Sequence, residues 1–389
     1  MENIKIPVST ILEMDDVGWD NGRDLRLIGQ ASRSGLPRYH ALGDYEFLNQ
    51  LADATGRHVA VALCLGDWDK ENFLRGEMGI THNPHGWDRK SEIDVEKFTK
   101  YRDALDAGYV DFMVHGLLHG RYTAEGKMIN EHEWYEYDVI DGKKGAERFS
   151  EEDFRHRLDL FFKIYNSWGF KQKIRGFVVP CSLPETESIQ RKMCKILREY
   201  GIVYWADNFR FPETLRVVEG VACFKWSHNA GRIPWEAYDF DPEVLGNIYA
   251  DDATENSALH GSHWTNYLRY NPEKNVKNVE RWAKYYERQG EVFGGALATT
   301  LAEAVNQLFY HEYTDMTLDC DVLTLDFSKV EEIKLDCHKN ELLISFKKGT
   351  TPKSIEGGDI SLYEEHREFN TYKIVHTGTR VTIKLGKSE

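Results

Sequence analysis

Short apolar stretches alternate with amphipathic ones along the first 310 residues of the chain. The apolar stretches are rich in β-branched residues, as the buried strands of a parallel sheet are. The amphipathic stretches carry apolar residues at helical spacing, and several end at a glycine, a common helix stop signal. The predicted strands are 3–14, 58–65, 109–116, 173–180, 202–207, 221–226 and 257–261, and the predicted helices are 45–56, 95–108, 150–169, 185–201, 272–290 and 300–310.

Strands that alternate with helices predict a largely parallel sheet, and this many units predict a (β/α) barrel, closed or incomplete. The pattern changes near residue 315, because the remaining sequence alternates apolar and polar residues at period two and shows no long helix. We therefore expect residues 1–315 to form an α/β barrel and residues 316–389 a small antiparallel β-domain. A chain of 389 residues is long enough for both.

Ionisable side chains follow the predicted strands at their carboxyl ends, where barrels of this class carry their chemistry. In chain order they are Asp15, Asp16, Asp67, His115, His119, Asp207, His260 and His263. Chance would scatter such residues over both faces of the barrel. Their clustering therefore predicts a functional site at the carboxyl end.

Asp15 and Asp16 are adjacent carboxylates at the end of an apolar strand, and burying them is costly unless a positive charge lies beside them. His115 and His119 have the spacing at which two imidazoles on one helical turn can share an ion. A divalent ion held by one aspartate and two histidines would explain both features and leave positions open for water and substrate. The alternatives are a solvated turn at Asp15–Asp16 and a hydrogen-bonded histidine pair that caps the end of a strand.

Five short motifs occur in a characteristic order: "MDD", "HGLLH", "IRGFVVP", "YWAD" and "ALHGSHW". In this order the chain resembles the polysaccharide deacetylases, the NodB-like carbohydrate esterase superfamily, over residues 5–310. The resemblance implies a barrel of the deacetylase type and a hydrolase that removes an acyl group. It leaves the C-terminal β-domain unexplained.

The first two motifs would hold the metal and the base under this resemblance. Asp16, His115 and His119 would be the metal ligands. Zn is the first expectation for the ion, although the same donors accept Co, Ni or Mn. Asp15 would be the general base that activates the attacking water.

The last three motifs would supply the rest of the implied site. Arg175 would hold or tune Asp15, with Asp207 as its own partner. Either His260 or His263 would be the general acid that protonates the leaving amine or alcohol. The stretch "RGFVVP" differs from the family pattern, in which the proline stands closer to the arginine, and the alternative for Arg175 is a surface residue that opens a strand.

Aromatic residues are numerous, with ten tryptophans in the chain. Several lie in stretches that resemble loops, where a flat amphipathic ring can stack on the face of a sugar. The predicted substrate-binding rings are Trp19, Trp68, Trp87 and Trp264. The alternative is that these rings pin long loops to the body of the protein.

Charge and hydropathy narrow the choice of partners. The formal net charge of −15 argues against a non-specific grip on nucleic acid or anionic lipid. No apolar run approaches ~18 residues, so we expect no membrane span. The first residues lack the pattern of a signal peptide, so we expect a cytoplasmic protein, or a periplasmic or secreted one if a signal had been removed. Oligomerisation is left open, and the β-domain could serve it or bind sugar.

The sequence therefore predicts a metal-dependent hydrolase that removes an N- or O-acetyl group from a carbohydrate. Two alternatives stay open. A glycoside hydrolase would use paired carboxylates as acid and base, and its activity would survive chelation. A non-catalytic carbohydrate-binding protein would keep the fold and bind sugar without turnover.

Overall fold

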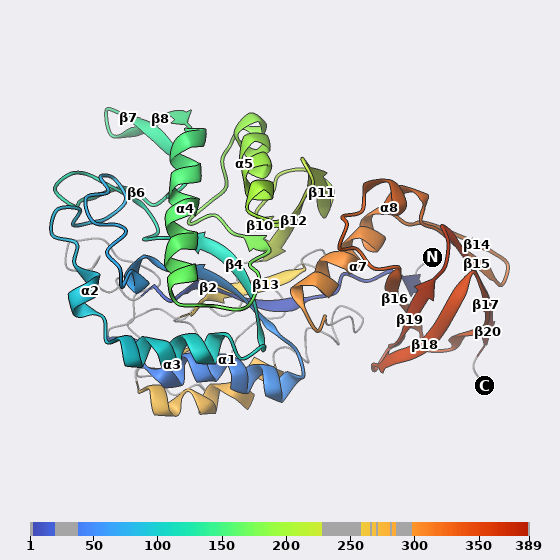
Figure 1. Cartoon of the computed structure of the whole chain (residues 1–389). Helices are drawn as coiled ribbons and strands as arrows, with labels where there is room; N and C mark the ends of the chain where they lie inside the picture. The colour runs from blue at the N-terminus through green and yellow to red at the C-terminus, as the bar shows by residue number, and fades with distance from the viewer. Residues whose placement is uncertain are drawn as a thin grey trace.

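The computed structural model describes residues 3–19, 38–227, 258–264, 267–269, 271–280, 282–284 and 298–387. Within these residues, seven parallel strands close into a barrel. In order round the barrel they are β2 (Ile11–Val17), β3 (Val59–Cys64), β4 (Val110–Gly116), β9 (Gly176–Phe177), β10 (Tyr204–Asp207), β12 (Val221–Ser227) and β13 (Leu259–His263). β10 pairs with β12 and β13 pairs with β2, which closes the ring (Figure 1). The predicted α/β barrel is confirmed.

Helices cover the outside of this barrel, as Figure 1 shows. They are α1 (Leu42–Thr55), α2 (Arg89–Glu92), α3 (Val95–Leu105), α4 (Glu151–Ser167), α5 (Glu187–Glu199) and α7 (Leu301–Tyr313), with short 3-10 turns η2 (Gly66–Trp68) and η7 (Pro272–Lys274). Ser150 accepts a hydrogen bond from the Asp153 N–H at the start of α4, and Thr300 does the same for Glu303 at the start of α7. These caps give partners to N–H groups that a helix start leaves unbonded.

The barrel strands separate two apolar layers, because successive side chains of a strand point to opposite faces. Leu12 of β2 points outward into the cluster that contains Leu48 of α1. Ile11 points inward and shares a cluster with Ala60 of β3 and Met113 of β4. A charged residue on the inward face of β2 is therefore surrounded by protein unless it lies at the carboxyl end of the barrel.

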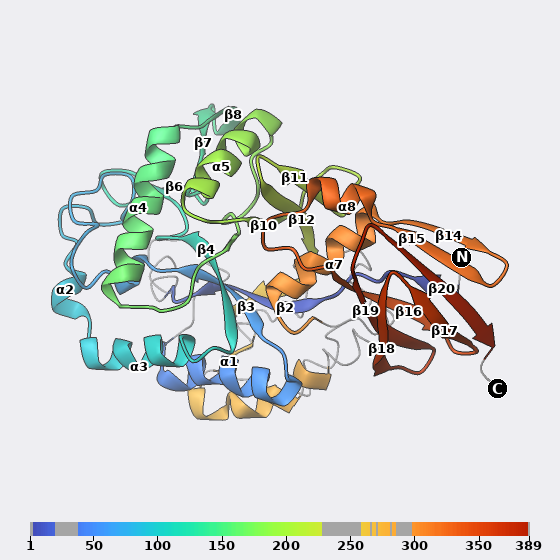
Figure 2. The ribbon, with the colours of Figure 1, turned by 45° about the vertical axis from the view of Figure 1, so that its right-hand side comes forward.

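The C-terminal region forms two four-stranded antiparallel sheets. One has the order β1 (Ile4–Lys5), β16 (Glu341–Lys347), β19 (Phe369–His376) and β18 (Gly358–Glu365). The other has the order β14 (Asp315–Asp319), β15 (Val322–Asp326), β20 (Arg380–Lys387) and β17 (Thr350–Glu356), and a short helix α8 (Ser328–Ile333) follows β15. Figure 2 shows these sheets beside α7, at the side of the barrel. The predicted strand 3–14 is thus two elements, of which β1 belongs to a C-terminal sheet.

Residues 120–149, a polar excursion of the chain between β4 and α4, fold as two hairpins at the carboxyl end of the barrel. They are β5 (Arg121–Tyr122) with β6 (Met128–Asn130), and β7 (Glu136–Ile140) with β8 (Lys143–Arg148). A further strand, β11 (Leu215–Val218), pairs antiparallel with β12. Residues 228–257, and residues 281 and 285–290 of the predicted helix 272–290, lie outside the described residues. Within the described part of the chain, no helix is both long and apolar enough to cross a bilayer.

Candidate metal centre

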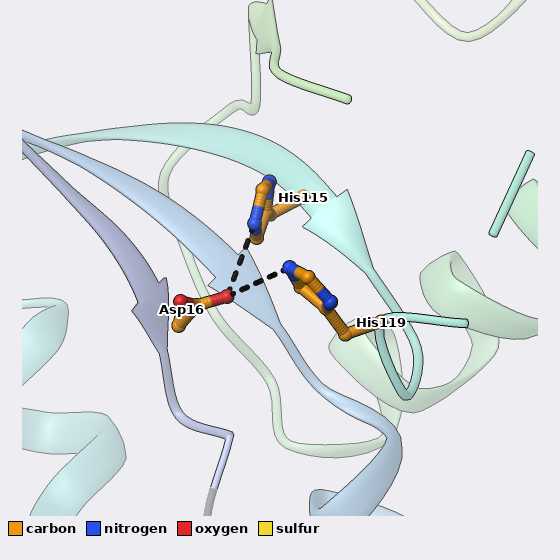
Figure 3. A group of neighbouring side chains, drawn as sticks. All are labelled: Asp16, His115 and His119. Carbon is orange, nitrogen blue, oxygen red and sulfur yellow. Dashed lines mark ion pairs between the residues drawn. The ribbon is translucent and has the colours of Figure 1, made fainter. Parts of the chain in front are cut away.

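Asp16, His115 and His119 meet at the carboxyl ends of β2 and β4 (Figure 3). The Oδ1 atom of Asp16 lies 3.1 Å from Nε2 of His115 and 3.4 Å from Nε2 of His119. All three residues are buried, and one donor atom from each lies within 4.8 Å of the others. The predicted trio is therefore brought together by the fold.

The backbone at Asp16 turns its carboxylate toward the histidines. Asp16 has a left-handed φ of 63°, and the pairing of β2 with β3 is irregular between Met14 and Val17. A positive φ is uncommon for a residue other than glycine and marks a position under local constraint. Because of this irregularity, Asp15 and Asp16 can both lie near the barrel mouth instead of on opposite faces of a regular strand.

His115 is held in one orientation by a backbone partner. Its Nδ1 lies 3.1 Å from the carbonyl oxygen of Val178, which follows β9. A carbonyl oxygen only accepts hydrogen bonds, so Nδ1 carries the proton and Nε2 is left as the atom that faces Asp16. An outer partner of this kind is typical of histidines that bind metal ions.

His119 comes from the turn after β4 and packs against an aromatic ring. Its ring stacks on Trp19 with centroids 4.6 Å apart and planes 12° from parallel. Trp19 is 3% exposed. The predicted substrate ring Trp19 thus lies at the site, but one face of its indole is covered by a candidate metal ligand.

The three donors fit a divalent first-row ion. Ligand bonds of about 2.0–2.2 Å in tetrahedral geometry separate neighbouring donor atoms by about 3.4 Å, close to the distances seen here. Burial lowers the pKa of His119, which favours the neutral ring that a ligand requires. Burial opposes charge on Asp16, yet the imidazoles of His119, His115 and His263 hold the pKa of its carboxyl well below the ordinary value. An Asp with two His is a donor set that Zn, Co, Ni and Mn accept.

The two aspartates favour the charged form of the His115 imidazole. Burial opposes the charge on His115, but Asp15 and Asp16 outweigh it and raise the pKa of His115 to about 9. Nδ1 of His115 lies 3.8 Å from Oδ1 of Asp15. Asp15 is therefore buried beside the ligands, as the base assignment requires.

Glu13 is a site residue that the sequence analysis missed. It lies two positions before Asp15 on the same face of β2, is fully buried, and its pKa is raised by burial and by the charge of Asp15. Gly261 lies opposite Glu13 on β13, and a Cβ atom there would stand 2.0 Å from Oε2 of Glu13. The signal in the sequence was a single glutamate inside the otherwise apolar run "ILEM".

Asp207 joins the same cluster from the end of β10. It is 2% exposed, and burial raises its pKa to about 7, with Asp15 and His115 among the charges that act on it. Its Oδ1 accepts a hydrogen bond of 2.8 Å from the N–H of Asn208. A carboxyl group with this pKa can hold or release a proton near neutral pH.

The strand register distinguishes the two histidines of β13. His263 pairs with Asp15, and its Nε2 lies 3.9 Å from Oδ2 of Asp16. His260 pairs with Leu12, which faces the outer apolar layer, and is 1% exposed. The structure thus places His263 beside the candidate metal ligands and His260 on the other face of the strand.

The expected place of Arg175 is corrected by the structure. Arg175 is exposed and precedes β9, on the same face as Phe177, which packs in the outer layer. It interacts electrostatically with Tyr204, whose hydroxyl contacts Cys337 of the C-terminal region. Arg175 is therefore not a partner of Asp15 or of Asp207.

Three of the predicted substrate rings are core residues. Trp68 is fully buried and packs edge-on against Tyr45, and Trp264, 1% exposed, packs against the same ring. Trp87 is 3% exposed, and its Nε1 donates a hydrogen bond of 2.9 Å to Asp69. These rings pin loops to the body of the protein and offer no open face to a sugar.

No protein-family model matches the chain, and no curated protein does. Solved structures of the CE4 family of polysaccharide deacetylases are similar to it. A CE4-family pseudoenzyme from Bacillus anthracis is 10% identical, with 77% of this chain and 66% of that chain covered and a TM-score of 0.38. A proposed polysaccharide deacetylase from Mycobacterium smegmatis is 11% identical, with 78% and 90% covered and a TM-score of 0.39.

A deacetylase solved with its substrate is 10% identical, with 78% of this chain and 91% of that chain covered and a TM-score of 0.36. The chain spans slightly less than two thirds of the Bacillus anthracis structure. At these identities and TM-scores the similarities carry nothing about activity, which has to be inferred from the residues of the site.

Proposed function

We propose that this chain is a metal-dependent hydrolase that removes an N- or O-acetyl group from a carbohydrate. The observation that carries the proposal is the convergence of Asp16, His115 and His119 on one point, with His115 oriented by the Val178 carbonyl. Zn²⁺ is the ion we propose, and when bound it would polarise the acyl carbonyl and lower the pKa of water. A neutral or cationic sugar suits the net charge of −15.

The residues beside the ligands supply the proton transfers in this proposal. Asp15, 4% exposed and beside His115, takes the proton of the attacking water as general base. His263 has a side chain that is 14% exposed and lies next to Asp16, so it can reach a leaving amine or alcohol and donate a proton to it. Burial raises the pKa of Asp207 to about 7, so this carboxyl group can hold a proton near Asp15.

The test is the metal content of the purified protein, compared between wild type and His119→Ala. We expect one equivalent of a transition metal in wild type, its loss in the variant, and acetate release from acetylated sugars only in the loaded wild type. Wild-type protein that stays metal-free after incubation with Zn²⁺ and Co²⁺ would reject the proposal. Acetate release that survives chelation would reject it too.

Carbohydrate binding without turnover is the second candidate. The observation that favours it is the exposed position of Arg175, which precedes β9 and lies on the outer face of the barrel with Phe177. This candidate predicts metal binding and sugar affinity without acetate release. Titration of acetylated and deacetylated sugars into the metal-loaded protein, followed by assay of acetate, separates the two candidates.

A further inference from the structure

The turn that carries His119 presents three consecutive backbone N–H groups to one buried carboxylate. Oε1 of Glu133 accepts from the Leu117 N–H at 2.6 Å, and Oε2 accepts from Leu118 at 3.0 Å and from His119 at 2.6 Å. Glu133 is fully buried and comes from the excursion of residues 120–149. One side chain thus binds the backbone of a candidate metal ligand and of the two residues before it.

The carbonyl groups of the same turn are bound from other sides. The Leu117 carbonyl accepts hydrogen bonds from the Gly66 N–H at 2.6 Å and from Sγ of Cys64 at 3.2 Å. The Leu118 carbonyl accepts one of 2.8 Å from the hydroxyl of Tyr122. The turn is therefore held between the end of β3 and Glu133, and loss of Glu133 would leave buried N–H donors without their acceptor.

His119 needs such support because its backbone is in a disfavoured conformation. Its φ of 61° lies in the left-handed region, which costs free energy for a residue with a Cβ atom. A relaxed backbone at His119 would turn the ring away from Trp19 and move Nε2 from its position 3.4 Å from Asp16. The hydrogen bonds of Glu133 oppose that relaxation at the residue itself.

The glycines on both sides of the turn make room for this arrangement. A Cβ atom on Gly116 would stand 2.5 Å from Oε2 of Glu133, and one on Gly120 would stand 2.7 Å from the Asn130 carbonyl. Arg157 of α4, 1% exposed, is an electrostatic partner of Glu133. The sequence "HGLLHG" thus has a structural reason for both glycines, and the buried carboxylate has a nearby positive charge.

We propose that Glu133 is a positioning residue for His119, which sets the affinity and the geometry of the metal centre without touching the ion. This inference rests on the proposed function, since it requires a metal ion at Asp16, His115 and His119. Outer partners that orient metal ligands typically change metal affinity by about 10–100-fold when they are replaced.

The experiment is a Co²⁺ titration of the metal-free protein, because the visible d–d bands of Co²⁺ report the geometry of its ligands. Glu133→Gln keeps the shape of the side chain but places an NH₂ group against a backbone donor. We expect it to bind Co²⁺ about 10–100-fold more weakly than wild type and to change the bands, with unchanged far-UV circular dichroism.

Glu147→Gln is the matched control. Glu147, from the same excursion, accepts hydrogen bonds from the Glu185 N–H at 3.0 Å, the Thr186 N–H at 3.1 Å and the Thr186 hydroxyl at 2.9 Å, and that segment carries no candidate ligand. This variant should bind Co²⁺ like wild type. If Glu147→Gln weakens binding as much as Glu133→Gln does, the effect is general loosening and the proposal is rejected.

The outcomes separate the two proposals. Wild-type protein that binds no Co²⁺ rejects the metal centre and with it the proposed function. Tight binding by wild type, its loss in His119→Ala, and equal affinity and bands in Glu133→Gln reject only the role of Glu133. If circular dichroism shows that Glu133→Gln does not fold, Glu133→Asp, which keeps the charge on a shorter side chain, is titrated in its place with the same criteria.

Discussion

Asp207 shows how burial, assisted by the charge of Asp15, raises the pKa of a carboxyl group. No arginine or lysine is among the contacts seen for it in the described residues, and its Oδ1 accepts one backbone hydrogen bond. Burial raises its pKa from the ordinary 3.8 to about 7. Because the folded protein holds this proton more tightly than the unfolded chain does, Asp207 links stability to pH.

The sign of this linkage follows from the raised pKa. The stabilising contribution is complete below pH 3.8 and is lost as the pH rises to about 7. Asp207→Asn removes the titrating carboxyl group and with it this loss of stability. The variant keeps the oxygen that accepts the hydrogen bond from the Asn208 N–H. In chelator, we expect the stability of the variant relative to wild type to rise by about 2–3 kcal/mol between pH 5 and pH 8.

Urea unfolding at several pH values measures this difference. Asp88→Asn is the control, because Asp88 is a half-buried carboxyl whose pKa is lowered by hydrogen bonds from Asn72 and Ser91. Its replacement should give a stability difference that is constant over the same pH range. A constant difference for Asp207→Asn would show that Asp207 is already ionised at pH 5.

Asp15 is the residue on which the rate should depend most. We expect Asp15→Asn to keep the metal, because Asp16 and the two histidines remain, and to lower kcat by about 10²–10⁴-fold through loss of the general base. Metal analysis and acetate release on the same sample test both halves. Normal turnover by this variant would exclude Asp15 as the base.

At the scale of elements, the pairing of β2 with β13 depends on a glycine, Gly261, which has no side chain. Gly261 leaves the space that the carboxyl group of Glu13 occupies inside the barrel. We expect Gly261→Ala to lower the free energy of unfolding by about 1–3 kcal/mol through overpacking. Glu13→Ala should remove much of that cost in the double variant, because it vacates the space.

Gly378→Ala is the control for this substitution. Gly378 lies in the turn between β19 and β20, and nothing stands within 4 Å of a Cβ atom placed on it. Its effect on unfolding should stay within about 0.5 kcal/mol. If the effects of Gly261→Ala and Glu13→Ala simply add, the two side chains do not compete for space.

Sequence patterns predicted the elements of the barrel better than the directions of their side chains. The long periodic helices followed from spacing, and an ion site of one aspartate with His115 and His119 followed from the ends of the strands. The choice of Asp16 as the candidate ligand came from the resemblance to the deacetylases. The choice between His260 and His263 needed the register of β13, since a shift of one residue exchanges the two faces of a strand. The misplacement of Arg175 has the same origin, because motif order gives a strand but not which face a residue takes.

The buried tryptophans were missed for a different reason. A stretch without periodic pattern reads as a loop, and the sequence does not show whether a loop lies outside the body or folds over it. Trp68 sits in the short turn η2 and is nevertheless enclosed by rings of α1 and α3. Glu133 escaped detection similarly, because its three partners are backbone groups that no residue pattern reveals.

At the scale of the whole molecule, β1 connects the first residues of the described chain to the C-terminal sheets. Ile4 pairs with Phe346, and the Lys347 N–H donates a hydrogen bond of 2.8 Å to the Asn3 carbonyl. Ile4 is 4% exposed, so its burial contributes about 1.5–3 kcal/mol. The N-terminal segment therefore stabilises a sheet formed otherwise by residues 341–376.

Deletion of residues 1–5 tests this connection. We expect amide hydrogen exchange to become faster in β16, at Lys347 first, because its acceptor is removed. Amides of β3, in the middle of the barrel, are the internal reference and should keep their protection. Unchanged exchange at Lys347 would mean that β1 does not hold the sheet edge in solution.

The place of β1 also sets an order of events during synthesis. Its two residues leave the ribosome before the barrel, but the strand that receives them is made only after α7. In the nascent chain the apolar side chains of Ile4 and Ile6 therefore precede the synthesis of β16, and the barrel strands assemble before β1 can pair. A chain cut near residue 315 would therefore leave the apolar β1 segment without β16, and it would leave β16 as an open edge of its sheet, where other strands can pair.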